Sequence, residues 1–264
     1  DVQKDHFDHL MAVYSAVVAH MDKAIGDLVA GLKKRGVFDN TLILFMSDNG
    51  GNAEAGPGGR SEGDPSKANS DWFCGESWAS LQNTPFRRYK HYNHEGGIAT
   101  PLIAHWPAGL NVESIGNRSG LFSRKAPGGP LCNQPAHLID IMATCVDVGL
   151  ATYPKEFNGK PIVPMEGTSL LNLFKGGSIE RGPIFWEHEG NAAVRDGSMK
   201  LVRAGRNGPW ELYDMKADRT EQHDLASAQP ETATKLAAKW DAWAQRAQVI
   251  PYPKQPGKKK APNP

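Results

Sequence analysis

The chain contains an uninterrupted apolar run that ends in a glycine-rich turn, and this pattern limits the fold classes that the chain can adopt. Residues 41–46 show no polar–apolar alternation, and residues 47–51 then read Ser-Asp-Asn-Gly-Gly. Such a run is typical of a strand that is buried on both faces. Asp48 and Asn49 therefore fall just beyond the carboxyl end of the expected strand, where open α/β sheets place their sites.

A long amphipathic helix precedes this strand. Apolar residues recur at intervals of three and four between Phe7 and Leu32, so that they share one helix face. The basic run at residues 33–35 suits a helix C-terminus, and Gly36 suits a left-handed cap. Helix, short turn and buried strand together predict an α/β fold.

The segments that follow predict a sheet with flanking helices. Residues 100–106 form a second apolar run and predict another buried strand, and residues 137–148 have helical spacing. Between the two strands, residues 56–70 are rich in Gly, Ser, Pro and charge, without an apolar period. We expect this segment to be a long surface loop.

The pattern changes after about residue 180. Four short strands are expected between residues 184 and 213, with a hairpin turn at Asp196-Gly197, and a helix is expected to begin near Pro230. Residues 176–250 therefore predict a small antiparallel sheet packed by a helix. Residues 251–264 are rich in Pro and Lys, and we expect them to form a disordered basic tail.

Composition excludes several classes of function. The 264 residues include 30 Lys and Arg against 29 Asp and Glu, and a net charge of +1 attracts neither nucleic acid nor an anionic membrane. No apolar run is long enough to span a bilayer. Cys74, Cys132 and Cys145 show no C-x-x-C spacing, so they predict neither a disulfide framework nor a zinc site.

Asp48 and Asn49 offer a carboxylate and a carbonyl oxygen at adjacent positions. Hard cations such as calcium bind to these ligands. The same Asp-Asn-Gly-Gly segment is equally good turn chemistry, so the motif alone does not decide between a metal site and a turn.

A second segment resolves this choice. Lys90 stands five residues before Glu95-Gly96-Gly97, and a predicted strand then leads to Trp106-Pro107. With the upstream Asp-Asn-Gly, this order resembles the sulfatase family. Further matching segments extend the resemblance over nearly the whole chain, at residues 138–144, 167–170 and 211–226.

The resemblance implies a fold and a set of roles. It implies that residues 1–175 are the C-terminal portion of the sulfatase catalytic domain, with part of an alkaline-phosphatase-like sheet. Asp48 and Asn49 would complete a calcium shell, and Lys90 would be catalytic and would bind a sulfate oxygen. His94 is a candidate for the substrate pocket. The implied substrate is an aryl or carbohydrate sulfate ester, and the implied location is periplasmic or secreted.

Sulfatases use a formylglycine nucleophile that is made in a C/S-x-P-x-R motif, and this chain has no such motif. We therefore expect the nucleophile and the other metal ligands in a missing N-terminal half, and we expect the chain alone to be inactive.

Other interpretations remain open. One is a phosphatase or phosphodiesterase of the same superfamily, and another is a non-catalytic fragment or module. His91, His94 and Glu95 could form an acid–base cluster, but a turn at Glu95 is preferred. His188 could meet a sugar substrate or could simply be solvated, and we prefer the second interpretation.

Overall fold

The computed structural model describes residues 2–110, 122–123 and 129–252, so nearly all of the predicted basic tail lies outside the described residues. The chain groups into two compact units. The first unit contains the described parts of residues 1–14, 48–100 and 183–264, and the second contains those of residues 15–47 and 101–182. The predicted division after residue 175 stays a prediction.

The predicted long helix is confirmed as α1 (Val2–Lys34), and its first turns belong to the first unit. Gly36 follows with a φ of +69°. Its N–H donates to the carbonyl of Lys33 (3.0 Å), and the N–H of Val37 donates to that of Leu32 (3.2 Å). These two bonds satisfy the last carbonyls of the helix, as the glycine predicts.

In the second unit, strands β1 (Ile43–Met46) and β4 (Leu102–His105) form an antiparallel pair. Both strands were predicted, but burial on both faces is wrong. Phe45 is 41% exposed and Ile103 is 58% exposed. Successive side chains point to opposite faces of a strand, and only the face that carries Leu44 and Leu102 packs onto a cluster around α6.

Short elements complete the second unit around the predicted helix α5 (Ile139–Val148). The buried Asp140 joins this helix to later segments, because its carboxylate accepts the N–H of Thr168 (2.8 Å) and pairs with Arg181. The remaining elements of this unit are η1 (Phe38–Asn40), β5 (Phe122–Ser123), β6 (Leu131–Cys132), β7 (Glu156–Phe157), β8 (Lys160–Pro161) and α6 (Leu171–Phe174).

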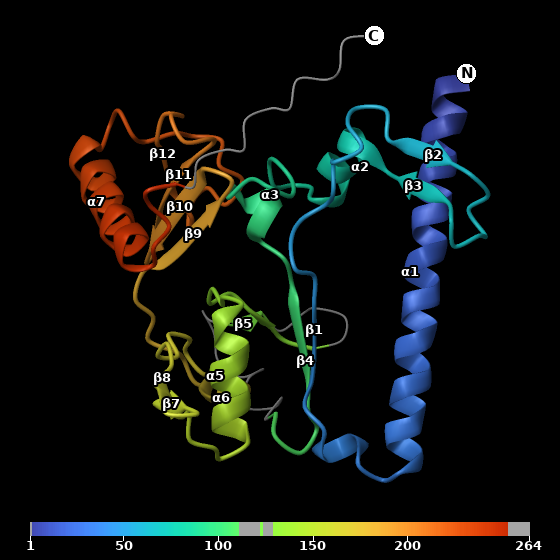
Figure 1. Cartoon of the computed structure of the whole chain (residues 1–264), viewed down its shortest axis with the longest axis horizontal. Coiled ribbons are helices and arrows are strands. Elements are labelled where there is room, and N and C mark those ends of the chain that lie inside the picture. Colours follow the sequence, from blue (N-terminus) through green and yellow to red (C-terminus); the bar gives the residue numbers. More distant parts are fainter. Residues whose placement is uncertain (1, 111–121, 124–128, 253–264) are drawn as a thin grey trace. The chain divides into compact units, whose positions relative to one another are not determined.

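The predicted C-terminal sheet is confirmed in the first unit as four antiparallel strands in the order β12-β11-β10-β9, with α7 (Pro230–Arg246) beside them (Figure 1). Trp240 of α7 is 1% exposed and packs in a core with apolar residues of the sheet. Gly197 has a φ of +60° in the predicted hairpin turn between β10 and β11. The strands are β9 (Ile184–His188), β10 (Asn191–Asp196), β11 (Met199–Arg203) and β12 (Glu211–Asp214).

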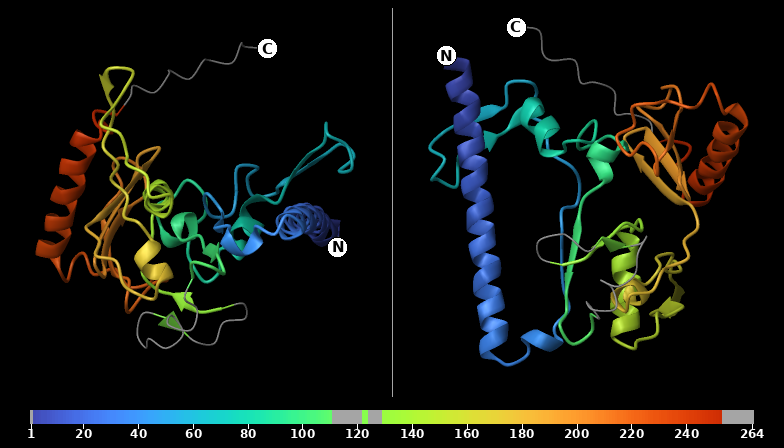
Figure 2. Two further views of the ribbon diagram at one scale, coloured as in Figure 1. Left: turned by 90° about the horizontal axis from the view of Figure 1, so that it is seen from below. Right: turned by 180° about the vertical axis from the view of Figure 1, so that it is seen from behind.

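A hairpin and two helices complete the first unit, and the hairpin lies beside the N-terminal turns of α1 (Figure 2). Trp78 donates its indole N–H to the carbonyl of Phe7 (2.9 Å), which ties these elements together. The predicted loop at residues 56–70 contains one strand, because Arg60 pairs with Phe73 in an antiparallel hairpin, and the Arg60 side chain also forms an ion pair with Asp71. The elements are β2 (Arg60–Glu62), β3 (Asp71–Phe73), α2 (Gly75–Gln82) and α3 (Glu95–Ile98).

Two further findings concern the cysteines and the helices. Cys74, Cys132 and Cys145 are all free cysteines. Among the described residues, no helix has the length and apolar character needed to cross a membrane.

Candidate functional site at the interlocked glycine pairs

The two glycine pairs of the sequence motifs lie against each other in the first unit. Gly50 donates its N–H to the carbonyl of Gly97 (3.0 Å), and Lys90 donates its N–H to the carbonyl of Gly51 (3.0 Å). Asn83 accepts the N–H of Gly51 through its side chain (2.9 Å). The turn that carries Asp48 and Asn49 is therefore fixed to the backbone of the Lys90 segment.

The close approach explains why glycine stands at these positions. A Cβ on Gly50 would lie 1.8 Å from the carbonyl oxygen of Gly96, and a Cβ on Gly97 would lie 1.9 Å from that of Tyr92. Both contacts are to backbone, which cannot rotate away as a side chain can. The glycines serve close packing between two loops, because no larger residue leaves room for this contact.

We expect Gly50→Ala to destabilise the chain by about 1–3 kcal/mol, the usual cost of overpacking. The added methyl group must push the Asp48 turn away from the Lys90 segment. Gly58→Ala is the matched control, since a Cβ there meets nothing within 4 Å and its φ is not positive. Thermal unfolding of both variants checks the prediction, and equal melting temperatures would contradict it.

Lys90 has a carboxylate partner in this unit. Its Nζ lies 2.8 Å from Oε1 of Glu54, and Asn52 holds the other carboxylate oxygen at 3.0 Å. The hydrogen bonds from Lys90 and Asn52 lower the pKa of Glu54 to about 2. The ammonium is partly exposed and has a counter-ion, and any bound anion would compete with that carboxylate for it.

Asp48 and Asn49 fit a hard cation by their chemistry. Asp48 is exposed and Asn49 is half-buried in the turn after β1. The Asn49 amide nitrogen donates to the carbonyl of Gly50 (2.9 Å). Asp48 and Asn49 would supply two of the six to eight oxygen ligands that calcium takes. Their role as metal ligands stays a prediction.

His94 lies in the interior of the unit. It is fully buried, and its Nε2 lies 3.4 Å from the Glu211 carboxylate. Within the described residues its Nδ1 has no hydrogen-bond partner. The structure therefore gives His94 a partner on the C-terminal sheet, and its contact with a substrate stays a prediction.

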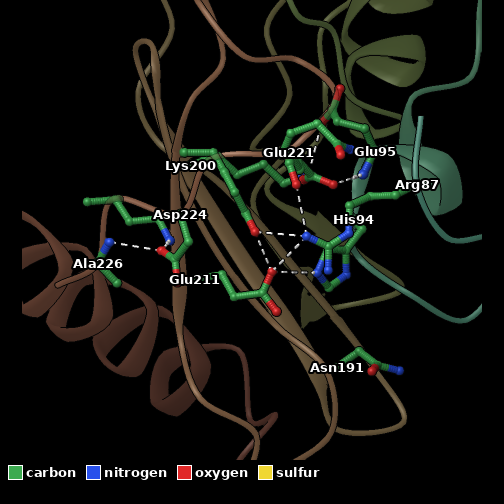
Figure 3. A network of polar contacts seen from close by, with 12 residues as sticks. Arg87, His94, Glu95, Asn191, Lys200, Glu211, Glu221, Asp224 and Ala226 are labelled. Atoms are coloured by element: carbon green, nitrogen blue, oxygen red, sulfur yellow. Dashed lines mark hydrogen bonds and ion pairs between the residues drawn. The ribbon is translucent and has the colours of Figure 1, made fainter. Parts of the chain in front are cut away.

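Glu95 is the N-terminal residue of α3, where a turn was predicted, and it enters a buried ion cluster (Figure 3). The Nζ of Lys200 lies 2.8 Å from Glu95 and 2.8 Å from Glu221, and none of the three side chains is more than 5% exposed. Arg219 contacts the second oxygen of Glu95 at 3.3 Å. Burial alone would raise the pKa of Glu95, but the nearby cations outweigh it and the pKa is lowered.

The same ion cluster also contacts the N-terminal end of α3. The second carboxylate oxygen of Glu221 accepts the N–H of Glu95 (3.0 Å), which satisfies one free donor of the first turn of α3. Glu95 and Glu221 thus anchor the Glu-Gly-Gly segment to strand β11, which carries Lys200. Sequence analysis assigned neither Lys200 nor Glu221 to the site.

Arg87 makes a second connection between the Lys90 segment and the sheet (Figure 3). Its guanidinium donates to Glu211 (3.1 Å), to the hydroxyl of Tyr213 (2.9 Å) and to the carbonyl of Glu221 (2.9 Å). Hydrogen bonds from His94 and Tyr213 lower the pKa of Glu211 to about 2.

These contacts predict sensitivity to acid. The folded-state pKa of Glu211 is depressed. Ionised Glu211 therefore stabilises the fold at any pH above the pKa of about 4.3 that the carboxyl has in the unfolded chain. We expect this contribution to be lost as the pH falls from that unfolded pKa to the folded pKa of about 2. Urea unfolding followed by tryptophan fluorescence at several pH values measures it. Glu211→Gln should flatten this dependence, and an unchanged slope in that variant would count against the prediction.

The fold is of the α/β class, and its Asp48–Asn49 turn after β1 is bonded through Gly51 to the segment that carries Lys90. The sulfatase family profile matches residues 2–148. This match covers more than half of the chain, and the chain belongs to the sulfatase family.

Curated relatives agree with this membership. The chain is 28% identical over 95% of its length to an uncharacterized sulfatase of Schizosaccharomyces pombe, of which it covers 46%. It is 24% identical over 96% of its length to a sulfatase of Formosa agariphila, of which it covers 45%. The chain therefore spans about half the length of these relatives.

Solved structures show the same fold. A crystal structure of Ps i-CgsB in complex with k-i-k-neocarrahexaose matches 90% of this chain with a TM-score of 0.62, 21% identity and 48% coverage of that structure. A phosphonate monoester hydrolase of Agrobacterium radiobacter matches with a TM-score of 0.50, 20% identity and coverage of 88% of this chain and 40% of that one. The predicted fold class, part of an alkaline-phosphatase-like α/β fold with a small C-terminal antiparallel sheet, is confirmed.

Proposed function

We propose that this chain supplies the metal-binding and sulfate-binding part of the active site of a calcium-dependent sulfate ester hydrolase. The nucleophile, a formylglycine in this proposal, comes from sequence outside these 264 residues. The main support is the backbone interlock, in which Gly50 bonds to Gly97 and Lys90 bonds to Gly51, so that the turn after Asp48 and Asn49 is fixed to the segment that carries Lys90.

Each residue has a chemical task in this proposal. Asp48 and Asn49 would hold calcium, which neutralises part of the sulfate charge when bound. Lys90 would place a compact positive charge on a sulfate oxygen and would stabilise negative charge as the ester bond breaks. The ion cluster around Lys200 would position the loop and would not touch the substrate.

The proposed substrate class is a carbohydrate or aryl sulfate. The names of two relatives support this proposal. One is an arylsulfatase of Klebsiella aerogenes, 29% identical over 64% of this chain, and the other is an N-acetylglucosamine-6-O-sulfatase of Bacteroides thetaiotaomicron. Bacterial relatives also support a periplasmic or secreted location as part of the same proposal.

The experiment compares the isolated chain with the complete protein that contains it, using nitrophenyl sulfate. We expect turnover by the complete protein and negligible turnover by the chain, because metal and Lys90 provide no covalent route without a nucleophile. Chelation of calcium should reduce the turnover, and Asp48→Ala should do the same. Turnover by the isolated chain that survives Asp48→Ala would contradict the proposal.

The phosphatase or phosphodiesterase alternative is tested in the same assay. The phosphonate monoester hydrolase shares the fold with this chain, at an identity that supports nothing beyond the fold. Preference of the complete protein for nitrophenyl phosphate or a phosphodiester over the sulfate would favour the alternative. Activity on none of these esters would favour a non-catalytic module.

A further inference from the structure

Three residues of the first unit form a candidate metal site that does not include Asp48 or Asn49. His91, His188 and Glu189 bring one ligand atom each within 4.8 Å of the others. We propose that this cluster binds a divalent transition-metal ion of the zinc type. The proposal goes beyond the proposed function, and the two share one residue, since Glu54 contacts both Lys90 and His91.

The distances between the ligand atoms match a tetrahedral metal site. Nδ1 of His91 lies 3.1 Å from Nε2 of His188 and 3.0 Å from Oε2 of Glu189, and the last two atoms are 4.0 Å apart. Zinc binds imidazole nitrogen and carboxylate oxygen at about 2.0–2.2 Å, which puts two ligands of one tetrahedron about 3.4 Å apart. The three separations lie on both sides of this value, so small side-chain movements would complete the site.

The charges around His91 also favour a cation. Nε2 of His91 lies 3.1 Å from the Glu54 carboxylate, while its Nδ1 faces the Glu189 carboxylate. A neutral imidazole carries one N–H, so it can satisfy only one of the two carboxylates. A metal ion beside Nδ1 would bind this nitrogen and the Glu189 carboxylate together. The same metal ion would also bind the lone pair on Nε2 of His188, which lies 3.1 Å from Nδ1 of His91.

Neighbouring groups hold the ligands in place. Asn191 is 8% exposed, and its amide donates to the carbonyl of His91 (2.9 Å) and to that of His188 (3.0 Å). One buried side chain thus fixes the backbone of both histidines. Glu54 accepts from the outer ring nitrogen of His91, an arrangement typical of carboxylates that orient metal-bound histidines.

The ligand set selects a particular class of metal. Two imidazoles and one carboxylate suit zinc and its first-row neighbours, whereas calcium prefers a shell made of oxygen. Three protein ligands leave a fourth position for water or another small ligand. His188 is 50% exposed and Glu189 is 64% exposed, so an ion has access from solvent.

The test is zinc titration of the 264-residue chain by calorimetry, with cobalt as a spectroscopic substitute. We expect one tight site with the visible cobalt bands of tetrahedral nitrogen and oxygen ligands. His188→Ala and Glu189→Gln should each lower affinity by at least about 100-fold, and Glu54→Gln by about 10- to 100-fold. His223→Ala is the control, because this histidine is 83% exposed beside Asp218 in the same unit and should leave binding unchanged.

Several results would overturn the proposal. These are the absence of tight binding, binding that His188→Ala and Glu189→Gln leave intact in folded protein, and displacement of zinc by millimolar calcium. A strong near-ultraviolet cobalt band would assign the metal to a cysteine thiolate instead. Asp48→Ala should leave zinc affinity unchanged, so the failure of this site and the failure of the proposed hydrolase are distinguishable.

Discussion

Lys200→Met should lower the free energy of unfolding by about 3–5 kcal/mol, the usual cost of removing one partner from a buried ion pair. The Lys200 ammonium lies 2.8 Å from both Glu95 and Glu221, with the lysine and Glu221 side chains fully buried. Methionine keeps most of the side-chain volume, so the loss comes from the charge. The two carboxylates would then face each other without that ammonium. This cost is a large part of the 5–15 kcal/mol by which domains are stable.

Urea unfolding measures this effect, and two further variants define its origin. Lys239→Met removes a lysine that pairs with Asp196 at the surface, with both side chains about one-third exposed, and should cost no more than about 1 kcal/mol. Lys200→Met combined with Glu95→Gln and Glu221→Gln should recover much of the loss, because the buried charges are gone. Equal losses for Lys200→Met and Lys239→Met would show that the buried cluster carries no special stability.

Local sequence patterns predicted most elements of the fold. The three-and-four spacing predicted α1, and short segments separated by turn residues predicted β9 to β12 and the hairpin at Gly197. These signals depend on near neighbours in the chain, so they are readable without tertiary contacts. The prediction that the strand at residues 41–46 is buried on both faces was wrong, because local patterns do not report tertiary packing. Burial depends on what packs against each face, and Phe45 is 41% exposed in this chain.

Only part of the candidate site could be predicted from the sequence. The spacing of Lys90 from Glu95 singled out a segment that the structure bonds to the Asp48 turn, from Lys90 to Gly51 and from Gly50 to Gly97. Sequence gave no sign that the two glycine pairs touch, because the contact is between backbones of distant segments. The glycine doublets themselves were the available signal of close approach.

Partners that lie far apart in the chain were missed. Lys200 is 105 residues from Glu95, and His188 is 97 residues from His91. Lys200 stands in a short strand with Leu201 and Val202, both fully buried, and a charged residue in such a strand could have suggested a buried partner. His188 was interpreted as solvated because its neighbours in sequence are both glutamates. The nearby His91 becomes visible only in the folded chain.

Lys90→Ala should reduce kcat for a sulfate ester by about 10²- to 10³-fold in the complete protein, the usual effect of removing one donor to developing negative charge. If the Lys90 ammonium contacts sulfate most strongly as the ester bond breaks, the loss appears in kcat more than in KM. The backbone bond from residue 90 to Gly51 survives in alanine, so the loop should keep its position. Glu54 loses a cation but is 45% exposed and tolerates this in water.

Two comparisons separate a catalytic role from a structural one. Lys67→Ala removes an exposed lysine from the loop at residues 56–70 and should leave kcat unchanged. Thermal unfolding of Lys90→Ala should match that of Lys67→Ala within a few degrees, because an exposed ion pair contributes at most about 1 kcal/mol. If Lys90→Ala retained wild-type kcat, the ammonium would serve only to hold Glu54. If it lost kcat and stability together, the loop rather than the charge would carry the effect, and the proposed sulfate contact would fail.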